Sequence, residues 1–154
     1  MKLAPIALTL CLGAISVTNT MATTITQTLK FETVVPPDDF TLKPTTPWPA
    51  AGAATPFNYD KVTDTFTAYT NELTIQSASH NVAAKLQAVA TLKAGKQTIP
   101  VEVKLGGTTL TPTAVKVHDK GPADGKYPLN IVPTGKGHPA GTYTGDVVLI
   151  FDGA

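Results

Sequence analysis

The sequence predicts an all-β fold, either a sandwich or a barrel. Helical periodicity is hard to find in it, whereas Thr, Val, Gly and Pro are abundant and strand-like runs recur with turn residues between them. In such a fold each strand buries one face, so apolar and polar residues alternate along it. No internal repeat divides the chain.

Residues 1–22 are predicted to be a secretory signal and not part of the fold. Lys2 supplies the positive start, Leu3 to Val17 is apolar, and Thr20-Met21-Ala22 places small residues where cleavage after Ala22 needs them. The apolar stretch is too short for a comfortable membrane span. Removing 22 of the 154 residues leaves 132, a length that suits a single domain.

The predicted mature chain is neutral and has no cysteine. Cleavage removes Cys11, the one cysteine, so disulfides are excluded and packing and hydrogen bonds must hold the domain. It also removes Lys2, which leaves 11 lysines against 11 acidic residues, and there is no arginine. The lysines are spread along the chain, so nucleic-acid binding, which uses a basic stripe and favours arginine, is not expected.

The first strand-like run of the mature chain is Thr23 to Thr33, which Pro36-Pro37 separates from the body. From Pro36 to Pro56 the chain is rich in Pro, Ala and Thr. This composition predicts extended, irregular chain along a sheet edge, because proline cannot donate a hydrogen bond to a central ladder. Its candidate anchors are Phe40, Leu42 and Trp48.

Three strands are predicted in the first half of the body from the alternation of apolar and polar residues. The first carries Leu73, Ile75 and Ser77 on one face. The second is expected to place small and apolar residues on one inner face, namely Ala84, Leu86, Ala88, Ala90 and Leu92. The third has the cleanest alternation of the chain, with Ile99, Val101, Val103 and Leu105 on one face.

Gly106-Gly107 predicts a type I′ hairpin after the third strand, because two glycines readily adopt the two positive φ angles that this turn requires. In the returning strand the apolar phase slips between Leu110 and Val115. A bulge or break at Pro112 is expected to absorb the slip.

The last third of the chain predicts two more strands and two loops. Asp119 to Lys126 is expected to be a polar loop, Tyr127 to Val132 a short strand, and Gly135 to Gly141 the final loop. The terminal strand, Gly141 to Phe151, is strongly apolar and β-branched, and only Asp152-Gly153-Ala154 follow it. A spare strand at the front and a terminal strand with nothing after it suggest chains that complete one another.

We expect the chain to have no enzymatic activity and to bind no cofactor, because its sequence shows no catalytic or metal-binding arrangement. Ser79 lies beside His80, but no third partner is evident, and both are interpreted as parts of a polar turn. His80, His118 and His138 lack the short spacings of metal ligands and are interpreted as surface or loop histidines. Asp38-Asp39, the one paired carboxylate, is typical of a turn.

Four stretches, whose positions are spread over nearly all of the mature chain, share motifs with one protein family. They are Ile25-Thr26-Gln27-Thr28 (family Ile-Thr-Val-Thr), Thr65 to Tyr69 (Thr-Phe-x-x-Tyr), Ile99 to Leu110 (Pro-Ile-Ser-Val-x-x-Gly-Gly-x-x-Leu) and Ala140 to Val148 (Ala-Gly-x-Tyr-x-Gly-x-Val). Through them the chain resembles the major pilins of the alternate chaperone–usher class, typified by the colonisation factor antigen I fimbriae of enterotoxigenic bacteria. Gln27 departs from the family, which has an apolar residue there.

The resemblance implies an immunoglobulin-like β-sandwich that lacks its last strand and is completed by the N-terminal donor strand of a neighbouring subunit. An open sheet edge beside an apolar cleft is both an aggregation hazard and a polymerisation site. The implied function is a structural major subunit that polymerises with identical subunits, by donor-strand exchange, into a surface fibre for adhesion or biofilm formation. The implied partners are a periplasmic chaperone, an outer-membrane usher and a tip adhesin subunit, and the implied location is a fimbria reached through the periplasm.

On this interpretation the chain has three parts: a signal peptide (1–22), a donor-strand extension (23–35) and an incomplete domain (36–154). The inserting face of the donor strand would be Ile25, Gln27, Leu29 and Phe31. The acceptor groove and terminal strand would include Tyr143, Gly145, Val147, Leu149 and Phe151.

The alternative is a soluble secreted β-sandwich that binds a carbohydrate or a protein, with the N-terminal run folded within its own chain. Exposed aromatic residues in a line would favour this alternative. Trp48, Phe57 and Tyr59 are the candidates, although Phe57 and Tyr59 are expected to pack in the core.

Overall fold

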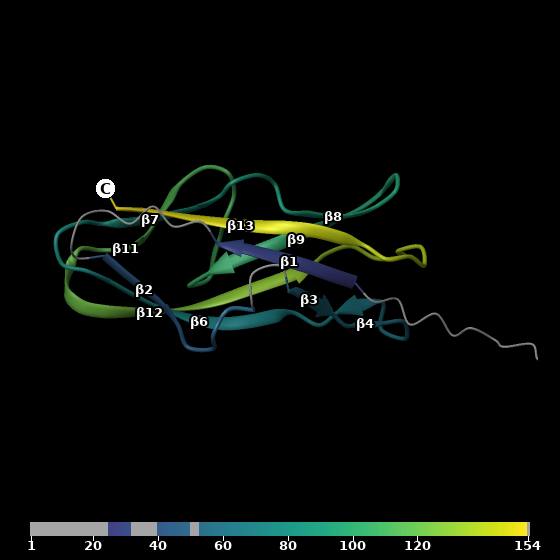
Figure 1. Cartoon of the computed structure of the whole chain (residues 1–154), viewed down its shortest axis with the longest axis horizontal. Coiled ribbons are helices and arrows are strands. Elements are labelled where there is room, and N and C mark those ends of the chain that lie inside the picture. Colours follow the sequence, from purple (N-terminus) through teal and green to yellow (C-terminus); the bar gives the residue numbers. More distant parts are fainter. Residues whose placement is uncertain (1–24, 32–39, 50–52, 154) are drawn as a thin grey trace, which may run out of the picture.

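The computed structural model describes residues 25–31, 40–49 and 53–153, and their regular structure is β-strand (Figure 1). The strands form two layers packed face to face, so the all-β prediction is confirmed in its sandwich form. The predicted signal segment, residues 1–22, lies outside the described residues. Within the described ranges, no helix is long and apolar enough to span a membrane.

The first layer is built around the terminal strand, β13 (Thr144–Gly153). Its order is β3–β1–β13–β7–β11, and β8 continues beside β13 where β7 ends. The other strands of this layer are β1 (Ile25–Phe31), β3 (Ala54–Phe57), β7 (Val82–Leu86), β8 (Thr91–Ala94) and β11 (Val115–His118).

The second layer has the order β2–β6–β12–β9–β10. Its strands are β2 (Phe40–Pro44), β6 (Tyr69–Ser77), β9 (Gln97–Leu105), β10 (Thr108–Thr109) and β12 (Gly121–Pro133). β9 joins the layers, because its first residues pair with β8 and its last residues pair with β12. A separate two-stranded sheet consists of β4 (Tyr59–Asp60) and β5 (Thr65–Phe66).

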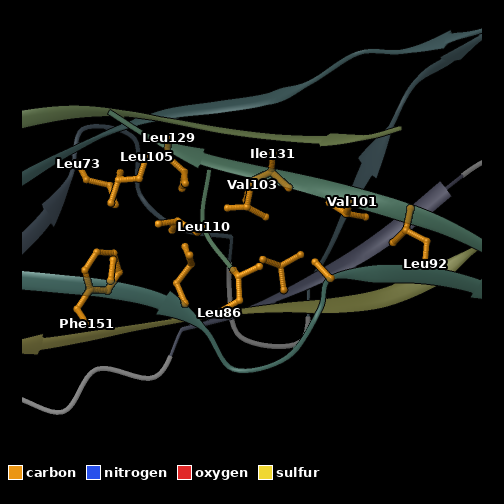
Figure 2. Close-up of a cluster of buried hydrophobic side chains, with 14 of the residues drawn as sticks. Leu73, Leu86, Leu92, Val101, Val103, Leu105, Leu110, Leu129, Ile131 and Phe151 are labelled. Carbon is orange, nitrogen blue, oxygen red and sulfur yellow. The ribbon is translucent and has the colours of Figure 1, made fainter. Parts of the chain in front are cut away.

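The core lies between the layers and is filled by every second residue of the central strands. Figure 2 shows Val103, Leu129 and Ile131 of one layer pointing into the same interior as Leu86 and Phe151 of the other. The predicted inner faces of β6 and β9 are confirmed, since Leu73, Ile75, Ser77, Ile99, Val101, Val103 and Leu105 are all buried.

The predicted hairpin after β9 is also confirmed. Gly106 and Gly107 have φ angles of 57° and 83°, and Thr108 pairs with Leu105 on the other side of the turn. The predicted break at Pro112 separates β10 from β11. The chain uses this break to leave the second layer and join the first, which is why the apolar phase slips there.

The prediction of one continuous inner face from Ala84 to Leu92 is wrong at Ala88, which is exposed. Leu86 lies opposite Leu149, and Lys93 lies opposite Thr144. Seven steps along the β7–β8 segment therefore match five steps along β13. The extra chain bulges out between the two strands, so Ala88 leaves the inner face while Ala90 and Leu92 return to it.

Two segments predicted to be irregular contain strands. The Pro-rich stretch forms β2, at the outer edge of the second layer, and β3. The edge position agrees with the proline argument, and of the expected anchors Phe40 is buried while Leu42 and Trp48 pack against the core. The predicted polar loop from Asp119 to Lys126 is wrong from Gly121 onward, because β12 begins there and pairs with β6 through an irregular register.

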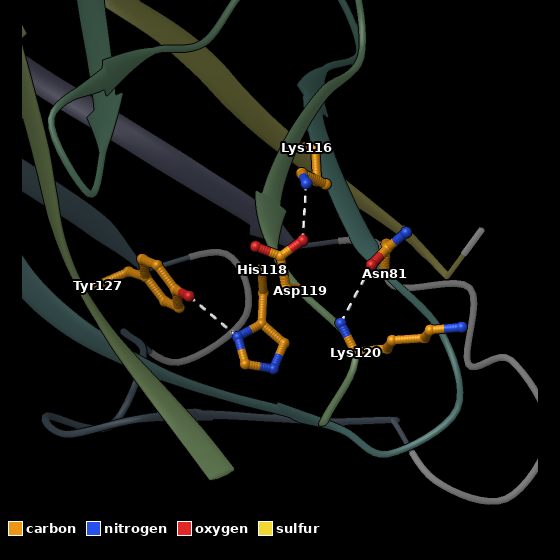
Figure 3. A network of polar contacts seen from close by, with 6 residues as sticks. All are labelled: Asn81, Lys116, His118, Asp119, Lys120 and Tyr127. Carbon is orange, nitrogen blue, oxygen red and sulfur yellow. Dashed lines mark hydrogen bonds and ion pairs between the residues drawn. The ribbon is translucent and has the colours of Figure 1, made fainter. Parts of the chain in front are cut away.

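His118 is buried, with 6% of its surface exposed, so its interpretation as a surface histidine is wrong. Its Nδ1 lies 2.9 Å from the hydroxyl of Tyr127, as Figure 3 shows. In the same turn from β11 to β12, the backbone N–H of Lys120 donates to the side chain of Asn81. These contacts fix the point at which the chain crosses from the first layer to the second.

We expect Gly125→Ala to lower the free energy of unfolding by about 1–3 kcal/mol, the usual cost of overpacking. A Cβ at Gly125 would lie 2.7 Å from Nδ1 of His118 and 2.5 Å from the Tyr127 hydroxyl, so the bond between these two side chains must open. Gly121→Ala, in the same strand, is the matched control because its Cβ would meet nothing within 4 Å. Urea unfolding measures both, and equal losses would contradict the prediction.

Candidate strand-binding slot

The two edges of β13 are paired very differently. Leu149 lies opposite both Leu86 of β7 and Phe31 of β1, so these two strands are on opposite edges of β13. One edge is paired with β7 and β8, which belong to the folded body. Within the described residues, β1 is the only strand paired with the other edge. The body therefore leaves one edge of its terminal strand to the N-terminal segment.

A second strand, β3, bounds the position of β1 on its far side. Residues 26–31 of β1 run parallel to residues 144–149 of β13, and residues 25–28 run antiparallel to residues 57–54 of β3. We call the position between β13 and β3 the slot. Figure 1 shows β1 lying along β13 within this arrangement.

Apolar side chains of β13 line the inner side of the slot. Val147, Leu149 and Phe151 are 2%, 1% and 1% exposed, and they alternate with the half-buried Val148 and Ile150. Tyr143, just before the strand, is buried as well, and its hydroxyl donates to the backbone carbonyl of Pro139 over 3.0 Å.

Gly145 lies where β13 passes very close to β8. A Cβ at this position would overlap the carbonyl oxygen of Thr91 and lie 3.2 Å from Cα of Leu92. These are backbone atoms, so they cannot rotate out of the way as a flexible side chain can. Any larger residue would push the slot-forming strand away from the body.

For the four expected donor positions, the structure gives the backbone register, that is, which residue of the neighbouring strand lies opposite each one. Positions 27, 29 and 31 lie opposite 145, 147 and 149 of β13, and position 25 lies opposite 57 of β3. Residues that lie directly opposite on neighbouring strands share a face of the sheet. The four positions therefore share the face that carries the buried residues of β13.

Sequence reasoning missed the wall formed by β3. Phe57, which ends this strand, is 2% exposed and belongs to the core, as expected, but its strand was assigned to irregular chain. A signal was present in Thr55-Pro56-Phe57, where the Pro-rich composition gives way to a β-branched residue and an aromatic one. Tyr59, in contrast, is only partly buried.

A cluster of side chains ties the two walls of the slot together at the end where β1 begins. Asp64 accepts a hydrogen bond from the hydroxyl of Tyr59, just after β3, and both its oxygens accept from the backbone N–H of Gly137, in the loop before β13. His138 packs against Phe66, with the ring centroids 5.4 Å apart. We call Tyr59, Asp64, Phe66, Gly137 and His138 the clasp.

The contacts of the clasp favour the ionised form of Asp64. The hydrogen bond from Tyr59 lowers the pKa of this carboxyl, and the Gly137 N–H and the charge of Lys136 lower it further. The same hydrogen bond raises the pKa of Tyr59. Asp64 also has a φ of 53°, a left-handed conformation that Asp tolerates better than most residues.

Ser79 and His80 form a turn in which the His80 N–H donates to Ser77. No three His, Cys, Asp or Glu residues in the described ranges are grouped so that they could hold a metal ion. A cavity of about 170 Å³ lies over the β7–β8 bulge, lined by Gln87, Ala88, Asp146 and Val148, and is smaller than typical ligand pockets.

Comparison with known proteins identifies a family and shows similarity to solved structures. The family model described as CS1 type fimbrial major subunit matches residues 6–152. A search of curated proteins gives no match. Among solved structures, the chain is similar to the CooA pilin subunit from enterotoxigenic Escherichia coli, with a TM-score of 0.57 and 21% identity over 76% of this chain and 88% of that one. At this identity the likeness shows the fold alone.

We expect Asp64→Asn to weaken the clasp and to lower the urea midpoint at neutral pH. Because the pKa of Asp64 is lowered in the folded protein, its stabilisation is present above its ordinary value of 3.8 and is lost as the pH falls through the lower, folded value. The variant lacks this loss, so its midpoint should fall less than that of the wild type between pH 5 and pH 2.

Asp124→Asn serves as the control, because Asp124 is an exposed carboxyl in β12, outside the clasp. Asparagine also tolerates the φ of position 64, so the change tests charge and not backbone strain. Equal midpoints for the two variants at each pH would contradict a role for the clasp.

Proposed function

The chain belongs to the family of CS1-type fimbrial major subunits, and on that premise we propose that it polymerises by donor-strand exchange through the slot between β13 and β3. It is a structural subunit of a chaperone–usher fimbria, an extracellular fibre, and its family is not one of enzymes. In the proposed exchange, residues 23–35 of one subunit fill the slot of the next. Residues 36–154 form the domain that receives them.

The observation that carries the proposal is that the edge of β13 facing the slot is paired only with the N-terminal strand in the described structure. Without that strand, the edge would present unpaired N–H and C=O groups beside Val147, Leu149 and Phe151. Three side chains of this size contribute on the order of 5–8 kcal/mol when buried. Whatever fills the slot therefore completes the sandwich.

The proposed roles of the site residues follow from the register. In the chain's own strand, positions 25, 27, 29 and 31 lie opposite inward residues of β13 and β3. We take the same face, Ile25, Gln27, Leu29 and Phe31, as the inserting face of the exchanged strand. Val147, Leu149 and Phe151 receive them. Tyr143 anchors the start of the terminal strand, and Gly145 permits its close approach to β8.

In the single chain the slot holds the chain's own strand, which is the arrangement that the alternative of a soluble binding module also predicts. Only the eight residues 32–39 connect this strand to β2. The tether limits how the strand can enter, and the strand runs parallel to β13. A strand from another copy has no such tether, and antiparallel pairing is slightly more stable per residue than parallel pairing. Exchange between copies is therefore physically reasonable.

The same slot accounts for the other proposed partners. An unfilled edge beside an apolar cleft aggregates readily, so a subunit crossing the periplasm needs a chaperone that occupies the slot until exchange. We therefore propose a periplasmic chaperone, an outer-membrane usher at which exchange occurs, and a tip adhesin subunit that begins the fibre.

The proposal is tested by thermal unfolding of three proteins: the processed chain, residues 36–154 alone, and residues 36–154 with 23–35 attached through a flexible C-terminal linker. We expect residues 36–154 alone to aggregate or to unfold without cooperativity, because the edge of β13 is unpaired. The linked form should be soluble, monomeric and stable.

Polymerisation provides the second readout. The processed chain should form fibres at high concentration, whereas the linked form should not, because its slot is filled and it has no free donor. If residues 36–154 unfold cooperatively at the same temperature as the linked form, the sandwich is already closed and donor-strand exchange is wrong for this chain.

A further inference from the structure

Val62 lies in the turn that joins β4 to β5, and its side chain is 94% exposed. A lone exposed valine is ordinary on a soluble protein, but this one is held in a fixed turn. The Asp60 carboxylate accepts hydrogen bonds from the backbone N–H groups of Val62 and Thr63, over 2.7 Å and 3.4 Å. Because the turn is already ordered, little conformational entropy would be lost when Val62 meets a partner.

The same turn is anchored to the body and carries a positive charge. The hydroxyls of Thr63 and Thr65 lie 2.7 Å apart, and the next residue after Thr63 is Asp64 of the clasp. Lys61, beside Val62, is exposed and has no ion-pair partner within the described residues. We call Lys61 and Val62 the hairpin tip, which thus presents an apolar side chain next to a cation.

The cavity over the β7–β8 bulge has the complementary character, and we call it the bulge pocket. Its apolar lining is Ala88 and Val148, and its polar lining is Gln87 and Asp146. Cavities of about 150 Å³ can hold a benzene molecule, so a pocket of this size has room for the side chain of a valine. Asp146 is exposed, and no ion pair joins it to another residue in the described ranges.

The bulge pocket and the hairpin tip both belong to the body, so neither depends on which strand fills the slot. β7 and β8 pair with the edge of β13 that faces away from the slot. The N–H of Gln87 donates to the carbonyl of Val148 over 3.0 Å, which fixes the bulge against β13. Figure 1 shows β4 at the lower right and the chain between β7 and β8 along the top, so the two features lie in different parts of the molecule.

We propose that the hairpin tip of one subunit docks into the bulge pocket of another copy in the fibre, with Val62 in the pocket and Lys61 beside Asp146. The inference rests on the proposed function and adds a second contact surface between copies. Val62 would contact Ala88 and Val148, while the opposite charges meet at the rim. A contact between two different surfaces is heterologous, so it can repeat along a filament, as donor-strand exchange does.

The contact is small, so it acts only within the fibre. One valine and one exposed ion pair bury far less than the roughly 1,000 Å² expected of a stable interface. Donor-strand exchange would hold neighbouring subunits together and raise the local concentration of the hairpin tip around the bulge pocket. We therefore expect docking in fibres and none between free subunits in dilute solution.

The first test is disulfide trapping in the whole processed chain, whose predicted mature sequence has no cysteine. Val62→Cys and Ala88→Cys are made together; both positions are exposed, so the variant should fold. Fibres formed at high concentration are oxidised and boiled in SDS without a reducing agent. We expect a ladder of multimers that disappears on reduction, and no ladder from protein oxidised in dilute solution.

The matched control combines Val62→Cys with Ala123→Cys. Ala123 is an exposed residue of β12, in the other layer of the sandwich. This variant should give no ladder beyond the dimers that two copies of position 62 can form by collision.

The second test reverses the charges in the variant that carries the cysteine pair. Lys61→Glu or Asp146→Lys alone should lower the linked fraction about two- to fivefold, the range that an exposed ion pair supports. The two changes together should restore it, because the pair is then reversed. Lys96→Glu, an exposed lysine in the turn from β8 to β9, is the control for net charge and should leave the ladder unchanged.

The yield of fibres, measured by sedimentation, separates the failure of this inference from that of the proposed function. If fibres form but the 62–88 ladder is absent, or the charge reversals do not rescue one another, donor-strand exchange stands and the docking is wrong. A ladder of equal strength from dilute protein would also overturn the docking, because it would report random collision. If the processed chain forms no fibres, the proposed function fails and the docking fails with it.

Discussion

The fold depends on the pairing of one edge of its terminal strand. β13 supplies Val147, Leu149 and Phe151 to the centre of the core, so it cannot move away from the sandwich without exposing them. Its outer edge must nevertheless be paired, because unpaired backbone groups beside apolar side chains invite other strands. In the described structure that pairing comes from a segment joined to the body by only eight residues. The strand that supplies these core residues therefore depends on the N-terminal segment for the pairing of one of its edges.

Residues far apart in the chain cooperate to keep the slot at the width of one strand. Gly145 allows β13 to lie tightly against β8, which fixes one wall from behind. Among the described strands, the other wall, β3, pairs only with β1 and would be held weakly without further contacts. The clasp supplies them, since Asp64 follows β3 closely and binds Gly137 in the loop that leads to β13. A pair of walls connected in this way would hold its spacing during the proposed exchange of the strand between them.

Most of the sandwich could be predicted from local patterns, and the parts that could not depend on pairing between distant residues. The alternation in β6 and β9 and the double glycine of the hairpin are local signals, and the structure confirms them. Ala88 fits the same alternation but is exposed, because the β7–β8 segment is two residues longer than the stretch of β13 with which it pairs. β3 escaped prediction because its partner is the N-terminal strand, not a neighbour in sequence. For the slot, the sequence indicated β1 and β13, but not the second wall, β3.

In the proposed exchange, a tethered donor strand competes with the strand of another subunit for the same slot, and the proposed chaperone would act on this competition. A strand held by a short linker is present at its own slot at a roughly millimolar effective concentration, which is far above the concentration of free subunits in a dilute solution. Left alone, the subunit therefore closes on itself, with its own strand parallel to β13. Fibre growth requires the slot to be kept from the chain's own strand until another strand arrives, and it requires that strand to bind better than the tethered one. Under the proposed function, occupation of the slot by a chaperone would meet the first requirement, and antiparallel entry without the constraint of the tether would meet the second.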